Sequence, residues 1–95
     1  MDNDEATIRL GNEYDSQLRE GLLAILKEMG AVVRERTYGI GGSQELEELT
    51  VTVENKVLVV EAETYIGLVV KGERRLVEEI GRRVHARLKP LSPLK

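Results

Sequence analysis

Apolar residues recur at three- and four-residue spacing in two stretches of the chain, and each stretch predicts an amphipathic helix. The first stretch covers residues 14–29, and its apolar residues are Tyr14, Leu18, Leu22, Ile25, Leu26 and Met29. The second follows Gly72, and its apolar residues are Leu76, Val77, Ile80, Val84 and Leu88. Gly30 ends the first helix because glycine adopts the left-handed conformation common after a helix, and Pro90 limits the second.

Between these helices the pattern changes to that of β-strands. Residues 31–38 are β-branched and charged, which predicts a strand, and a flexible loop is expected over residues 39–43. Leu49, Val51 and Val53 alternate with polar residues and predict a second strand. Asn55 then favours a tight reversal, because asparagine tolerates a positive φ.

The apolar segment of residues 57–71 is too long to be one straight strand. At ~3.3 Å per residue it would extend ~50 Å, whereas a domain of this size has a radius of gyration near ~13 Å. We therefore predict two strands, near residues 57–63 and 66–71, although a single bent strand is the alternative. Residues 7–10 alternate too briefly to decide whether they form an opening strand.

Two helices that bracket hairpin-linked strands predict an α+β domain with an antiparallel sheet of three to five strands and both helices packed on one face. The expected order is (β)-α-β-β-β-(β)-α, in a single domain of residues 1–95 with flexible tails at 1–6 and 90–95. Within the segment 57–71, six residues are expected to point toward the helices: Leu58, Val60, Ala62, Ile66, Leu68 and Val70.

This order of elements is similar to that of double-stranded-RNA-binding domains, which run helix, three strands, helix. Their second helix starts with a lysine-rich cluster, for which residues 71–75 (Lys-Gly-Glu-Arg-Arg) are a loose analogue. Glu73 and the additional strand depart from the pattern of that family. The resemblance is one of element order, and no function is carried over from it.

Several chemistries are excluded by residue types that the chain lacks. Without cysteine there is no disulfide, thiolate metal site or cysteine nucleophile, and the single histidine, His85, rules out multi-histidine metal sites. We expect no catalytic residues, no metal and no cofactor; Glu61 and Glu63, two residues apart on a strand, are the weak alternative for acid–base chemistry. The acidic start of the chain and the lack of a long apolar run predict a cytoplasmic protein without a membrane segment.

The sheet face opposite the helices is predicted to carry apolar residues, namely Val57, Val59, Tyr65 and Val69. An antiparallel sheet with one solvated face normally presents polar side chains on that face. An exposed apolar patch on a small protein commonly marks an interface. We therefore expect a homodimer that forms through the open sheet face; the alternative is that these are scattered surface residues.

Charge is distributed unevenly along the chain. Residues 1–63 hold fourteen acidic and six basic residues, whereas residues 64–95 hold three acidic and eight basic ones. Lys71, Gly72, Arg74 and Arg75 lie at the predicted start of the second helix, where free amides and the helix dipole favour an anion. Cations are unfavourable there for the helix itself, so a small anionic ligand or a phosphorylated partner is a candidate.

The sequence thus predicts a small, non-catalytic binding or assembly module that dimerises through its sheet. A regulatory domain that binds a small anion at residues 71–75 is the alternative. Nucleic acid is not expected, because such domains are usually basic and this chain has a pI of 5.2.

Overall fold

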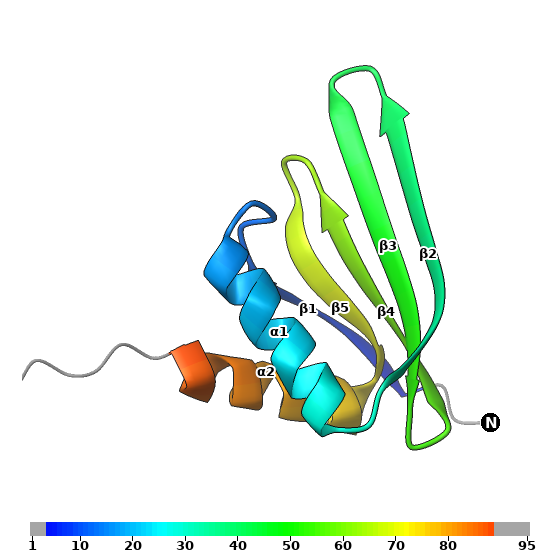
Figure 1. The fold of residues 1–95 in the computed structure, drawn as a ribbon, viewed down its shortest axis with the longest axis vertical. Helices are drawn as coiled ribbons and strands as arrows, with labels where there is room; N and C mark the ends of the chain where they lie inside the picture. Colours follow the sequence, from blue (N-terminus) through cyan, green and yellow to red (C-terminus); the bar gives the residue numbers. More distant parts are fainter. Residues whose placement is uncertain (1–3, 89–95) are drawn as a thin grey trace, which may run out of the picture.

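The computed structural model describes residues 4–88 and contains five strands and two helices (Figure 1). The elements are β1 (Glu5–Gly11), α1 (Ser16–Glu28), β2 (Val32–Gly41), β3 (Gln44–Val53), β4 (Lys56–Glu63), β5 (Gly67–Glu73) and α2 (Arg74–Leu88). This order confirms the predicted α+β class, with the opening and the additional strand both present.

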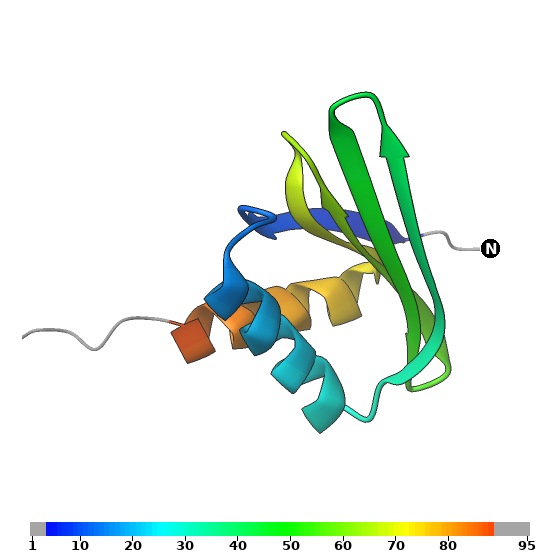
Figure 2. The same ribbon diagram turned by 45° about the horizontal axis from the view of Figure 1, so that its top comes forward.

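The five strands form one antiparallel sheet in the order β1-β5-β4-β3-β2. β1 therefore pairs with β5 at one edge, and β2 forms the other edge. Both helices lie on the same face of the sheet, α2 along β1 and β5 and α1 beside it (Figure 2). Within residues 4–88, neither helix is long and apolar enough to cross a membrane.

One aliphatic core joins the helices to the sheet. Its buried members come from the apolar stripe of each helix and from one alternating phase of β3, β4 and β5: Leu18, Leu22, Ile25, Leu26, Val51, Val53, Leu58, Val60, Leu68, Val70, Leu76, Val77, Ile80 and Val84. Ala62 packs against this cluster. Five of the six residues of segment 57–71 that were predicted to face the helices do so, because the period-two alternation of a strand holds through both β4 and β5.

Ile66 is the exception to this prediction. It lies in the turn between β4 and β5, and its side chain is 48% exposed. The backbone amide of Ile66 donates to the Glu63 carbonyl oxygen at 3.0 Å. Tyr65 in the same turn has a φ of 73°. The reversal is thus a tight turn over residues 64–66, and β5 begins one residue later than predicted, at Gly67.

The reversal between β3 and β4 confirms the turn predicted at Asn55. Glu54 and Asn55 have φ values of 55° and 66°, so both adopt the left-handed conformation. Two such residues form the type of hairpin turn whose twist matches the twist of the flanking strands. Helix α1 begins at an Asp15 cap, whose carboxylate accepts from the Leu18 amide at 3.1 Å. Tyr14 precedes this cap, so it lies outside the helix whose apolar stripe it was predicted to join.

Two further predictions are corrected by the pairing of the strands. The loop expected over residues 39–43 is only a two-residue turn, because Gly39, Ile40 and Gly41 pair with β3 and extend β2. Glu5 and Ala6, which were expected to belong to a flexible tail over residues 1–6, pair with Glu73 and Gly72 of β5. The tail predicted at residues 90–95 lies outside the described residues, as do residues 1–3.

Candidate functional site

Of the four residues predicted to bind an anion, only Arg74 and Arg75 lie in α2. Lys71 and Gly72 belong to β5, and the Lys71 Nζ atom lies 3.1 Å from Glu61 Oε1 on the open sheet face. Arg75 lines a separate polar hollow together with Glu54, Glu78 and other charged residues. The cluster of cations read from the sequence is therefore split between two sides of the molecule.

Arg74, the first residue of α2, has an internal partner. Its Nε atom donates to Asp4 Oδ1 at 2.7 Å, and its backbone amide donates to the Asp4 carbonyl oxygen at 3.0 Å. This hydrogen bond and the charge of Asp4 raise the pKa of the Arg74 guanidinium further, so it stays protonated. Asp4 therefore compensates the unfavourable cation at this helix start, because β1 brings it next to a residue seventy positions later.

The apolar residues predicted on the open sheet face are spread over its length. Val57 is 56% exposed near the start of β4, whereas Tyr65 is 77% exposed and lies in the turn beyond the other end of β4. The strand between them spans roughly 20 Å at 3.3 Å per residue. Val69 is only 6% exposed and lies between Arg9 of β1 and Glu61 of β4.

Polar side chains occupy much of the same face. Val59 has Thr50 on one side and Lys71 on the other, and Val57 lies opposite Thr52. Glu48 of β3 is directly opposite Glu61 of β4. A hydrogen bond to Glu61, then partial desolvation and the Glu61 charge, raise the pKa of the Glu48 carboxyl. The open face is therefore a mixed surface with a pair of repelling carboxylates near its middle.

The cleft between α1 and the helix-facing side of β3 and β4 was not anticipated from the sequence. It has a volume of about 240 Å³ and an apolar floor, and it is lined by Arg19, Leu22, Leu23, Arg36, Glu47, Leu49, Val60, Ala62 and Leu68. The hairpin of β2 and β3 extends away from α1, so no helix covers the hairpin end of the sheet (Figure 2). Nothing in the local pattern predicts the cleft, because it arises where α1 and the twisted sheet separate.

Charged side chains surround the mouth of this cleft. Arg19 Nη2 lies 2.6 Å from Glu47 Oε1, and Arg19 Nη1 donates to the Glu13 carbonyl oxygen at 3.0 Å. Arg36 projects from β2 on the same side, because it lies directly opposite Leu49 of β3. Within residues 4–88, the Arg36 guanidinium makes no ion pair or hydrogen bond with another side chain.

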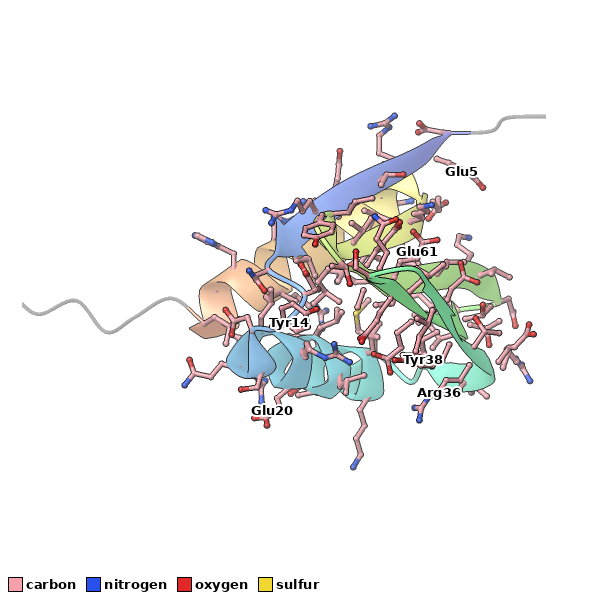
Figure 3. The ribbon with its side chains drawn as sticks, turned by 90° about the horizontal axis from the view of Figure 1, so that it is seen from above. Glu5, Tyr14, Glu20, Arg36, Tyr38 and Glu61 are labelled. Atoms are coloured by element: carbon pink, nitrogen blue, oxygen red, sulfur yellow. The ribbon has the colours of Figure 1, made fainter. Side chains whose placement is uncertain are left out.

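Tyr38 lies two residues beyond Arg36 on the same side of β2. Figure 3 shows Arg36 and Tyr38 along the hairpin, across from the start of α1 where Tyr14 lies. Partial desolvation, followed by the charge of Glu45 and a hydrogen bond to it, raises the pKa of the Tyr38 hydroxyl. Tyr38 is therefore neutral at physiological pH, and it is 58% exposed.

β2 itself is an edge strand without cover. All ten of its residues are exposed, and it projects with β3 beyond the end of β4 (Figure 1). Gly41 and Gln44 flank the two-residue turn and so form a hydrogen-bonded pair, after which bonded and non-bonded pairs alternate. The amides and carbonyls of Arg36, Tyr38 and Ile40 therefore point away from β3. Among residues 4–88 no strand pairs with this edge.

Comparisons with family models, with curated proteins and with solved structures found no match to this chain. Within the described part of the chain, no group of three or more histidine, aspartate or glutamate side chains is placed to hold a metal ion. The β2 edge and the cleft beside it are the candidate functional surfaces of the described residues.

Proposed function

We propose that the chain is a non-catalytic assembly module that forms a homodimer by pairing β2 with β2 of a second copy. The observation that carries this proposal is the ten-residue edge strand whose every residue is exposed. Such an edge offers a row of free amides and carbonyls to another strand, and proteins usually shorten, cover or interrupt it. β2 is long, lacks proline and has its single register irregularity near its start, between Val33 and Glu35.

The side chains of β2 favour one register. A two-fold axis perpendicular to the sheet makes two identical strands antiparallel and keeps both helix layers on one side. With the axis at Thr37, each Arg36 lies opposite Tyr38 of the other copy, and Thr37 lies opposite itself. An arginine over a tyrosine ring is a favourable cross-strand pair of about 0.5–1 kcal/mol at an exposed site.

Neighbouring registers are less favourable. An axis at Glu35 or at Arg36 places two like charges directly opposite each other, which destabilises a strand pair. An axis at Tyr38 pairs the two tyrosines but shortens the overlap to residues 35–41. The register centred on Thr37 keeps residues 33–41 paired and avoids both costs.

This interface differs from the one expected from the sequence. The open sheet face carries Val57 and Val59, but it also carries Glu48, Glu61 and Lys71, which an open-face dimer would have to desolvate. Pairing at the β2 edge leaves those charges in water. The β2 edge is therefore the better supported surface, and the open face is the competing outcome of the test.

A single cysteine tests the register directly, because the natural chain has none. Thr37 is opposite itself in a non-hydrogen-bonded position, where the Cα atoms of a strand pair are about 4.5 Å apart, within the range that a disulfide spans. Thr37→Cys should form a disulfide-linked dimer under mild oxidation, seen on a non-reducing gel. Val57→Cys is the matched control on the open sheet face and should remain largely uncrosslinked.

A charge exchange tests the cross-strand pair without a covalent bond. Tyr38→Lys places a lysine opposite Arg36 of the second copy and should dissociate the dimer at micromolar concentration. Adding Arg36→Glu to that variant puts opposite charges across the two-fold axis and should restore the dimer. Light scattering reports each state against the 10.7 kDa mass of one chain. A natural chain that is monomeric at ~100 μM, or crosslinking of Val57→Cys in place of Thr37→Cys, would overturn the proposal.

A further inference from the structure

The cleft beside α1 is too large to be a packing defect. Its volume of about 240 Å³ far exceeds the roughly 10–15 Å³ that one water molecule requires. The floor is built from aliphatic side chains of α1, β3, β4 and β5, namely Leu22, Leu49, Val60, Ala62 and Leu68. Water in such a cleft finds few hydrogen-bond partners, so an apolar chain that replaces it is stabilised by burial.

The rim adds a charge requirement to this apolar floor. Arg19 is engaged by Glu47 at 2.6 Å and by the Glu13 carbonyl, so its position is fixed. Arg36, on the opposite side of the cleft, keeps its guanidinium donors free of protein partners within residues 4–88. A guanidinium binds a carboxylate through two parallel hydrogen bonds, and it repels cations.

We infer that the cleft binds a small amphiphile with an apolar chain and a carboxylate head. The chain lies on the aliphatic floor beneath Leu23, and the Arg36 guanidinium holds the head at the rim. The site is complete within one copy, so it does not depend on the proposed dimer. In a dimer, Tyr38 of the second copy contacts the face of the guanidinium and leaves its donor edge open to the carboxylate.

Octanoate, below the concentration at which it aggregates, is the probe. Titration into isotope-labelled protein should shift the methyl signals of the floor residues, whereas acetate should not. From butanoate to octanoate the affinity should rise about fourfold per methylene, which corresponds to about 0.8 kcal/mol of burial for each.

Two variants separate the parts of the site. Arg36→Gln should weaken octanoate binding about tenfold, because a charge-assisted pair is lost, while leaving octanol binding unchanged. The matched control is Arg34→Gln: Arg34 belongs to the same strand, but its Nε atom donates to Thr52 Oγ1 at 3.1 Å, away from the cleft. Ala62→Met fills the floor and should abolish binding of both ligands.

The same titration on the Tyr38→Lys variant distinguishes this inference from the proposed dimer. Octanoate binding to that monomer supports the site whatever the fate of the dimer. The inference is overturned by the absence of methyl shifts with millimolar octanoate, by equal losses in the two arginine variants, or by an affinity that does not grow with chain length. The chain-length series uses the natural protein, so it decides the matter even if Ala62→Met fails to fold.

Discussion

Gly67→Ala should destabilise the fold strongly, because Gly67 is where β1, β5 and the preceding turn meet. Its φ of 115° is a conformation that side chains rarely adopt. A Cβ atom there would lie 2.5 Å from the Gly11 carbonyl oxygen and 2.5 Å from Arg9 Nε. The Arg9 side chain can move, at the cost of its 2.7 Å hydrogen bond to the Ile66 carbonyl, but the Gly11 backbone can move only if β1 separates from β5.

The expected cost follows from these two contributions. Backbone strain of this kind is about 1–3 kcal/mol, and the displaced strand adds to it, so the free energy of unfolding should fall by about 2–4 kcal/mol. For a domain of this size each kcal/mol lowers Tm by about 4–8 °C, which gives a fall of about 8–30 °C. Thermal unfolding followed by circular dichroism measures it.

A matched substitution controls for the loss of glycine itself. Gly39 in β2 has open space around its Cβ position and no positive φ, so Gly39→Ala should leave Tm unchanged or raise it slightly, by stiffening the unfolded chain. Hydrogen exchange should show faster exchange in β1 of Gly67→Ala than in β3. A Tm within about 3 °C of the parent, or equal effects at the two glycines, would refute the reasoning.

Two further predictions test the core and the open face. Ile80 is fully buried beneath the sheet, so Ile80→Ala should lower the free energy of unfolding by about 2–5 kcal/mol in urea titrations. Val57 is exposed, so Val57→Ala should change the free energy of unfolding by less than about 0.5 kcal/mol. Similar losses at both positions would contradict the assigned core. Glu48→Gln should raise Tm at neutral pH, because it removes the repulsion from Glu61. Glu61 raises the folded-state pKa of Glu48 above its unfolded value, so the folded chain binds this proton more readily and the repulsion is relieved as the pH falls through that folded pKa. The gain in Tm should therefore shrink toward about pH 4, and a gain that is constant with pH would exclude this origin.

The repeating patterns of the sequence predicted both helices, the strands between them and the helix-facing side of β4 and β5. The spacing of Leu76, Ile80 and Val84 required one apolar stripe on α2, and the alternation through β4 and β5 assigned Leu58 and Val70 to the core, as the structure confirms. These properties depend on the 3.6- and two-residue periods of the backbone, which are local. Turn positions were predicted less well, because Ile66 and the glycines of residues 39–41 are compatible with more than one local conformation.

The candidate sites, in contrast, depend on contacts that the local pattern does not show. Lys71 and Arg74 are three residues apart in sequence, but one pairs with Glu61 and the other with Asp4. The local sequence pattern does not predict the cleft or the unpaired β2 edge, because both form only where α1, the twisted sheet and the long hairpin come together. The sequence alone determined the apolar stripe of each helix and the helix-facing phase of β4 and β5, although Val69 of the opposite phase is also buried. The tertiary structure decided which charges are neutralised and which surface is left unpartnered, since electrostatic pairing and edge exposure depend on distances between residues that are far apart in the chain.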